Sequence, residues 1–160
     1  MGDLSEFSLK YKLFLKAYQW RRIDPVPWTP LAKPLDTCRV ALVSSAGFVA
    51  PDQPRFDDAK RGGDPSFREI SSAVDVATLI ESHRSEIFDH SGIRQDPNLA
   101  FPIDRLNELC ARGRIGAVND RHLSLMGSIT APGRLIKQTA PAAVKALVDD
   151  GVDVALLVPV

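Results

Sequence analysis

The sequence predicts an α/β fold, a small parallel sheet with flanking helices in a Rossmann-like arrangement, preceded by an N-terminal amphipathic helix. Two observations favour the α/β fold. Residues 39–45 and 152–158 are short, nearly continuous apolar runs rich in β-branched residues, typical of strands buried on both faces of a parallel sheet. Residues 133–150 form a helical pattern directly before the second run, as in a right-handed β–α–β unit.

The remaining elements follow from local patterns. In residues 5–20, aromatic side chains recur at i, i+4, i+7 and i+11 from Phe7, so we expect a helix that packs on the core or on a second subunit. A basic membrane-binding helix is the alternative. Residues 24–37 contain four prolines, and each disfavours helix in the residue before it. This segment is expected to be an extended linker.

Two further elements are predicted in the second half of the chain. Residues 102–112 form a helical pattern with a proline at the first position and a glycine just past the end. Cys110 shares the apolar face of that helix and is expected to fill the core. Residues 115–118 are expected to form a short strand. Pro141 is expected to kink or split the last helix, because its ring meets the carbonyl group of Lys137.

Composition limits the classes of function. The chain has 160 residues, enough for one domain with a core, and its 20 basic residues balance 20 acidic ones, so overall charge does not favour nucleic acid as a partner. No apolar run approaches the roughly 18 residues of a membrane span. Cys38 and Cys110 form no CxxC motif. We expect a cytoplasmic protein with reduced cysteines and no membrane association.

Several polar side chains are candidates for substrate binding. Arg68 follows a Gly-Gly and Asp-Pro turn, where an arginine can clamp a carboxylate bidentately; a surface ion pair is the alternative. Two histidines near carboxylates between 83 and 90 raise the question of a metal, but their spacing does not fit an i, i+4 ligand pair, so no metal site is assigned. The candidates, chosen as polar groups in loops near strand ends, are Arg68, His83, Asp89, His90, Arg105 and His122.

Small residues follow the first predicted strand. Ser44, Ser45 and Gly47 permit close approach of backbone or ligand at this point. The segment is neither GxGxxG nor a Walker sequence, so a plain strand-to-loop turn is favoured over a nucleotide-binding loop.

An ordered set of local patterns resembles one known family. The patterns are VALVSSAG at 40–47, GDPSFREI at 63–70, the stretch from 83 to 90, DPNLAFPIDRLNEL at 96–109, GRIG at 113–116 and GVDVALLVPV at 151–160. Together they resemble the selenoprotein B family of glycine/sarcosine/betaine and D-proline reductases, with its short stand-alone members closest. The resemblance covers most of the chain from Val40 to Val160.

The resemblance implies a cytoplasmic oxidoreductase that uses selenol or thiol chemistry to cleave a carbon–nitrogen bond reductively. Its substrate would be a small amine or amino-acid-like molecule, and a dithiol or thioredoxin-type partner would supply electrons, with no further cofactor. In the family, a selenocysteine or cysteine in a U/C-x-x-C motif directly follows the strand that resembles LLVPV. The catalytic residue is therefore expected directly after Val160, and neither Cys38 nor Cys110 matches it.

The expected organisation is an N-terminal helix and Pro-rich linker at 1–38 and an α/β reductase-like domain at 39–160, incomplete at its C-terminus. A UGA selenocysteine codon interpreted as a stop would produce such a chain. The missing elements should leave an apolar sheet edge exposed, which favours a homo-oligomer or aggregation. Whether these residues alone are an enzyme stays open. The alternatives are a non-catalytic α/β binding or assembly module and, third, a metal-dependent hydrolase.

Overall fold

The computed structural model describes residues 8–18, 22–83, 85 and 90–160. It divides into two compact units, Met1–Pro30 and Leu31–Val160, which are described separately. The first unit contains helix α1 (Leu9–Ala17), so the expected helix is confirmed over these residues. Its Phe14 and Tyr18 rings lie 5.6 Å apart on one face, as the periodicity predicts. What this face covers, and the expected boundary at residue 38, stay predictions.

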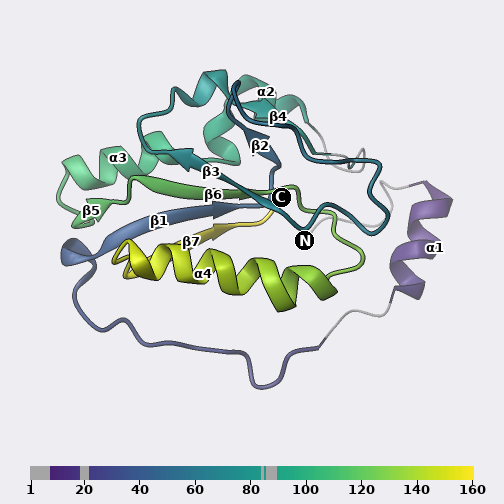
Figure 1. Ribbon diagram of the computed structural model, residues 1–160, viewed down its shortest axis with the longest axis horizontal. Helices are drawn as coiled ribbons and strands as arrows, with labels where there is room; N and C mark the ends of the chain where they lie inside the picture. Colours follow the sequence, from purple (N-terminus) through teal and green to yellow (C-terminus); the bar gives the residue numbers. More distant parts are fainter. Residues whose placement is uncertain (1–7, 19–21, 84, 86–89) are drawn as a thin grey trace. The chain divides into compact units, whose positions relative to one another are not determined.

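The second unit contains both strands and helices (Figure 1). Its strands are β1 (Arg39–Ser44), β2 (Phe48–Val49), β3 (Phe67–Ser71), β4 (Ile80–Glu81), β5 (Ala117–Val118), β6 (Arg121–Leu125) and β7 (Val154–Val158). Its α-helices are α2 (Ser91–Gln95), α3 (Ile103–Ala111) and α4 (Ala140–Asp149). Short 3₁₀ turns η2 (Leu35–Thr37), η3 (Val76–Thr78) and η4 (Pro97–Leu99) and a π-helical turn η5 (Leu135–Thr139) complete it.

Strand β1 is the centre of a mostly parallel, five-stranded sheet. It pairs in parallel with β7 along its whole length, with β5 near its start and with β6 near its end. Because β7 pairs with the same residues of β1 as β5 and β6 do, β7 must lie on the opposite side from both. Strand β3 adds to β6 in antiparallel orientation, and β2 and β4 form a separate antiparallel pair. The prediction that the strands near 39–45, 115–118 and 152–158 belong to one parallel sheet is therefore confirmed.

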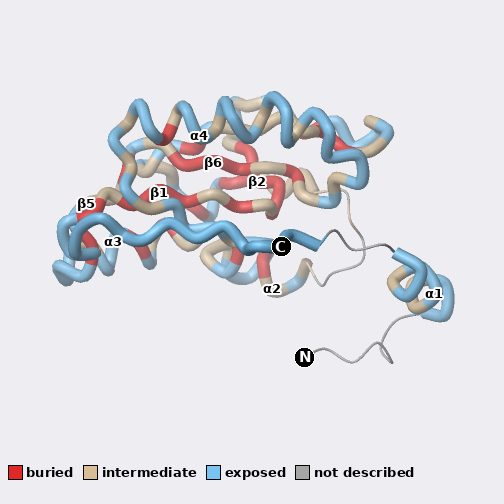
Figure 2. Tube along the Cα trace, turned by 90° about the horizontal axis from the view of Figure 1, so that it is seen from below, coloured by how far each residue is buried: buried red, intermediate tan, exposed pale blue. Residues whose placement is uncertain are grey.

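Helices cover the two faces of the sheet. One face packs against α3 and the loop before it, with Phe101, Ile103 and Leu106 in a core shared with Leu42. The other face packs against α4 through Leu147. Figure 2 shows that buried residues concentrate in the central strands, while much of α4 is exposed. Because successive β1 residues contact different helices, both faces of that strand are apolar.

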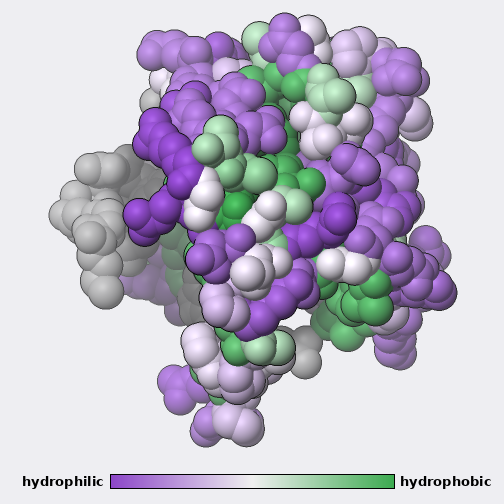
Figure 3. Space-filling view, turned by 90° about the vertical axis from the view of Figure 1, so that its left-hand side faces the viewer, coloured by the Kyte–Doolittle hydropathy of each residue, from purple (hydrophilic) through white to green (hydrophobic). Residues whose placement is uncertain are grey.

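The last strand differs from its prediction in burial. Strand β7 is not buried on both faces: Leu156 is 40% exposed and Leu157 is 68% exposed. The physical reason is that β7 is an edge strand, with β1 as its neighbour on one side only. The expectation of an exposed apolar edge is confirmed. Elsewhere, on the side of α3 and β5, Figure 3 shows a hydrophobic area bordered by hydrophilic side chains.

Three local findings refine the predicted elements. Helix α3 begins at Ile103, so its proline occupies the N-cap rather than the first helical position. The last helix does change at Pro141, as expected: a π-helical turn precedes α4, and Pro141 lies in the first turn of α4, where a missing N–H costs little. Strands β3 and β6 add an antiparallel pair that the predicted small parallel sheet lacked. The Rossmann-like description stays a prediction.

Candidate functional site

The carboxyl ends of three parallel strands meet at one edge of the sheet. Strands β1, β6 and β7 run in the same direction, so the segments after Ser44, Leu125 and Val158 leave the sheet together. In open α/β sheets, ligands bind in the crevice beyond such carboxyl ends. This edge is therefore the first place to search for a functional site.

Hydrogen bonds hold the three strand ends in place. Ser45 N donates to Val158 O over 3.1 Å, and Val160 N donates to Ser45 Oγ over 2.9 Å. Gly47 N donates to Leu125 O over 2.8 Å, which ties the end of β1 to the end of β6. The small residues after β1 therefore serve close approach of backbone to backbone, as the sequence predicts. The end of β7 is fixed beside Ser45.

His83 lies at the same edge, against two glycines. A Cβ on Gly127 would lie 2.8 Å from His83 Nε2 and 2.5 Å from Ser45 O, and a Cβ on Gly47 would lie 3.0 Å from His83 N. Both glycines also have positive φ angles, 67° and 71° respectively. These two positions must be glycine because the imidazole and its backbone occupy the space of a side chain. His83 Nδ1 accepts a hydrogen bond from Ser85 N at 3.0 Å, so Nε2 carries the proton of the neutral ring.

His90 is oriented by a carboxylate. Its Nδ1 pairs with Glu81 Oε1, and its Nε2 lies 2.7 Å from Ser85 O. Both histidines of this loop thus contact the backbone of Ser85, one through its N–H and one through its carbonyl group. Asp89, the candidate between them, lies outside the described residues. Glu81 is a member of this group that sequence reasoning missed, since it precedes the histidine-rich stretch.

The two candidate arginines lie elsewhere and have other contacts. Arg68 uses its guanidinium on the loop before β3, donating to Pro54 O at 2.8 Å and Arg55 O at 3.0 Å, with its charge over the Phe56 ring. Arg105 is exposed on α3 and pairs with Glu108 over 2.9 Å. The structure therefore brings His83 and His90 together through one loop and leaves both arginines apart from them.

His122 is in a strand, and its prediction as a loop residue is wrong. It lies within β6 and is fully buried, with its ring centroid 6.2 Å from that of Phe101 in an edge-to-face arrangement. Its Nδ1 accepts a hydrogen bond from Leu42 N at 2.9 Å. Burial lowers the pKa of His122 to about 4, against an opposing influence of the Asp120 charge. The ring is therefore neutral near pH 7 and anchors β6 to β1.

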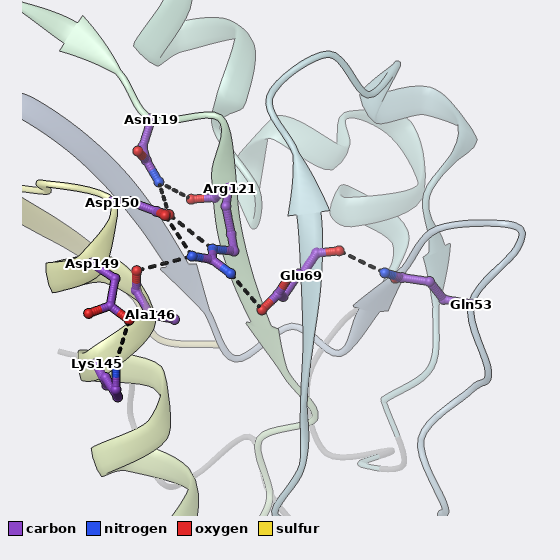
Figure 4. Close-up of polar contacts among 8 residues, drawn as sticks. All are labelled: Gln53, Glu69, Asn119, Arg121, Lys145, Ala146, Asp149 and Asp150. Atoms are coloured by element: carbon purple, nitrogen blue, oxygen red, sulfur yellow. Dashed lines mark hydrogen bonds and ion pairs between the residues drawn. The ribbon is translucent and has the colours of Figure 1, made fainter.

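A polar network at the opposite end of β6 has a structural role (Figure 4). Arg121 Nη2 donates to Asp150 Oδ1 at 2.6 Å and to Ala146 O at 3.1 Å, and Arg121 Nη1 donates to Glu69 at 3.1 Å. The hydrogen bonds that Asp150 accepts from Arg121 and Asn119 lower its pKa. The network joins β3, β6 and the end of α4. It explains how an aspartate is tolerated at the negative end of a helix dipole.

Among the residues that the structure describes, no group of three or more His, Cys, Asp or Glu side chains is placed to hold a metal ion. None of the described helices combines the length and apolar character needed to cross a bilayer.

Comparison with known proteins identifies relatives along nearly the whole chain. Residues 7–159 match the family model "Glycine/sarcosine/betaine reductase selenoprotein B (GRDB)". The chain is 35% identical over 136 residues to D-proline reductase subunit gamma of Acetoanaerobium sticklandii, covering 84% of this chain and 54% of that protein.

Two further relatives are subunits of reductase complexes. The chain is 29% identical over 160 residues to sarcosine reductase complex component B subunit beta of Peptoclostridium acidaminophilum, covering 97% of this chain and 35% of that protein. It is 30% identical over 160 residues to glycine reductase complex component B subunit gamma of Carboxydothermus hydrogenoformans, again covering 97% and 35%.

The matches cover most of this chain but only part of each relative. The chain spans about half the length of the D-proline reductase relative and about a third of the other two. No solved structure matches it. The family model covers nearly every residue, and the resemblance noted in the sequence is confirmed. The chain belongs to the glycine/sarcosine/betaine reductase selenoprotein B family.

Proposed function

We propose that this chain forms the substrate-side α/β part of a selenol- or thiol-dependent reductase that cleaves a carbon–nitrogen bond. The observation that supports this most is the edge where β1, β6 and β7 end, with His83 packed against Gly47 and Gly127. Enzymes with parallel sheets place their chemistry at such an edge. Family membership supplies the class of reaction, and the edge supplies a place for it.

The proposed redox residue is a selenocysteine or cysteine in a U/C-x-x-C motif directly after β7. That position lies next to Val160, whose N–H is held 2.9 Å from Ser45 Oγ. A selenolate or thiolate there would attack as the nucleophile, and the second cysteine would resolve the intermediate. For the overall reaction, a dithiol donor gives two electrons and two protons and becomes a disulfide. The carbon–nitrogen bond is replaced by a C–H and an N–H bond.

Of the candidate substrate-side residues, His83 has the placement that best fits this role. Its ring lies at the edge, whereas His122 is enclosed in the core, Arg68 binds loop carbonyls and Arg105 is exposed on α3. We propose that the Nε2–H of His83, buried against Gly127, helps to position the end of β6 at this edge. His90, paired with Glu81, would orient the same loop. We propose a cytoplasmic location, where dithiol donors are available.

The nucleotides after the Val160 codon test the placement of the redox residue. The proposal expects TGA or a cysteine codon at the next position and a cysteine codon three positions further in frame. Another stop codon, or an open frame without this spacing, would refute it. For the reaction, the protein with that motif and a dithiol donor should release an amine from glycine, sarcosine or betaine, or open the ring of D-proline to a linear amino acid. Residues 1–160 alone should not, and turnover by residues 1–160 would contradict the assignment.

A role in assembly is the second candidate, and an exposed surface favours it. Leu157 of β7 and Val144 and Val148 of α4 are 68%, 60% and 65% exposed. Exposed apolar side chains on a sheet edge and on a helix that covers the sheet favour an interaction surface. Relatives of the chain are subunits of reductase complexes by name. Sedimentation of the chain alone and with co-expressed subunits would measure this role independently of any turnover.

A further inference from the structure

A cavity of about 610 Å³ lies beside the segment that leaves β6, and cations line it. Lys60, Arg61 and Arg134 contribute to its wall, and no carboxylate is among its lining residues. In the part of the chain that the structure describes, neither Arg61 nor Arg134 makes a side-chain hydrogen bond or an ion pair. Arg68, in contrast, is fully engaged by loop carbonyl groups. Lys60 pairs with Asp64 over 3.5 Å, so the positive charge that this cavity offers to a ligand is that of Arg61 and Arg134.

The two walls of the cavity are joined to each other. One wall is the loop that contains Lys60 and Arg61, and the other is the start of the last helix. Ala131 N donates to Gly62 O over 3.0 Å, and a Cβ on Gly62 would lie 2.4 Å from the Ala131 Cβ. Gly62 also has a φ of 86°, a conformation that favours glycine. The cationic side chains therefore extend from backbone segments in fixed contact.

A buried carboxylate fixes the first wall. Asp64 is 6% exposed and accepts hydrogen bonds from Asp57 N at 3.1 Å and from Ser66 N and Oγ at 3.1 and 2.9 Å. Burial alone would raise the pKa of Asp64, but these hydrogen bonds and the Lys60 charge together lower it. The loop is thus closed around an ionised aspartate. Because Asp64 is occupied by its own loop, it leaves the arginines free for a ligand.

The second wall adds backbone donors. The first helical hydrogen bond here runs from Ile136 N to Pro132 O at 2.9 Å. The N–H groups of Gly133, Arg134 and Leu135 precede it, so the helix offers them no carbonyl acceptor four residues earlier. No side-chain cap forms at Arg134. Such amides, at the positive end of the helix dipole, favour an anion. Gly133 has no atom within 4 Å of where its Cβ would lie, so this wall is open to a ligand.

The cavity and the proposed catalytic edge share one segment. Gly127, which lies against His83, is four residues from Ala131 in the cavity wall, so their Cα atoms are at most about 14 Å apart. Glycine, sarcosine and D-proline appear in the names of the relatives, and each of these molecules has a carboxylate and an amine. A pair of guanidinium groups matches the planar, bidentate geometry of a carboxylate.

We propose that the cavity lined by Lys60, Arg61 and Arg134 binds the carboxylate of a small amino-acid-like substrate. This rests on the proposed function for the identity of the substrate, while the anion site stands on the geometry of the chain itself. The carboxylate is held by the arginines and the first-turn amides, and the amine end is left toward the sheet edge. The same geometry would reject a simple amine, which the three cations repel.

The test is a titration of the 160-residue chain, followed by amide NMR, with glycine, D-proline, acetate, methylamine and inorganic phosphate as separate probes. The two amino acids and acetate should shift the amides of Gly63, Ala131 and Gly133 and compete with one another, and methylamine should shift none of them. Arg61→Met and Arg134→Met should each weaken acetate binding about tenfold or more, as expected for a lost charge-assisted hydrogen bond. Both side chains are exposed, so retained amide dispersion should confirm that the variants fold.

The matched control is Arg112→Met, since Arg112 is also exposed and lines a different cavity of about 470 Å³ near the start of β1. It should leave acetate affinity unchanged. Equal weakening by all three substitutions, binding of phosphate without any carboxylate, or no carboxylate binding would each overturn the proposed site. Carboxylate binding by residues 1–160, combined with no reductase activity of the protein that carries the redox motif, would uphold the site and contradict the proposed function. The two failures are therefore distinguishable.

Discussion

Acidification should destabilise the chain through His122 in a way that one substitution can isolate. The imidazole is fully buried, and its Nδ1 already accepts the Leu42 N–H, so a second proton would place two donors against each other. Its Nε2 is also buried, without a hydrogen-bond partner among the described residues. The folded chain therefore keeps His122 neutral, with a pKa of about 4 instead of the ordinary 6.5. The unfolded chain protonates it freely.

The sign and size of the His122 contribution to stability follow from proton linkage. Since the unfolded state binds more protons between pH 6.5 and pH 4, stability falls as pH falls through this window. The contribution of His122 should be a loss of about 2 kcal/mol at pH 5 and about 3 kcal/mol at pH 4, relative to pH 7.5. Screening by solvent does not reduce this estimate, because the ring is fully buried.

The assay is urea denaturation of the wild type and of His122→Asn at pH 7.5, 5 and 4. Asparagine can accept the Leu42 N–H through its side-chain oxygen and does not titrate. Carboxylates such as Asp64 and Asp150 titrate in both proteins, so the difference in free energy of unfolding isolates the histidine. As pH falls, the free energy of unfolding of the wild type should decrease by more than that of the variant. A difference independent of pH, or a His122 ring that titrates by NMR near pH 6.5, would refute the reasoning.

Three further predictions concern stability and association. Gly62→Ala should lower the free energy of unfolding by about 1–3 kcal/mol, because the new methyl group would clash with Ala131 and the φ angle is positive. Gly133→Ala is the control and should not destabilise the fold, since there is open space around Gly133. Chemical denaturation measures both variants, and equal effects would contradict the geometry. Arg121→Met should lower Tm in a calorimetric scan by more than Lys145→Met, because the lysine substitution removes only an exposed i, i+4 ion pair. A larger decrease of Tm for Lys145→Met would show that the network does not join β3, β6 and α4. Leu157→Lys should reduce concentration-dependent self-association in sedimentation velocity, and unchanged association would exclude the β7 edge as its cause.

Side-chain periodicity was enough to find the elements that are regular and apolar. The runs that became β1 and β7 are recognisable because they are short and nearly continuously apolar, and the pattern that became α3 is recognisable because its apolar residues share one face. Strand β6 was missed because it mixes Arg121, His122 and Ser124 with apolar residues. Its burial depends on partners 50 to 80 positions away, such as Glu69 and Leu42. A local window contains none of that information.

The candidate site could also be predicted from the sequence only in part. Histidines and arginines can be selected from the sequence by type, but their roles depend on what surrounds them. Packing places His83 against Gly127 at the sheet edge and encloses His122 in the core, and hydrogen bonds commit Arg68 to its own loop. The cationic cavity was not predicted, since Arg61 and Arg134 are 73 positions apart and meet only because two loops are hydrogen-bonded together.

By itself, the sequence determined the α/β class, the parallel strands near 39–45 and 152–158 and the family, because hydrophobic periodicity and ordered motifs are properties of the linear chain. Only the tertiary structure decided which strand is central and which is an edge. It also decided which polar groups are buried or exposed and which cations share a cavity. These depend on contacts between distant segments, where each group's solvation and partners are set by the whole fold.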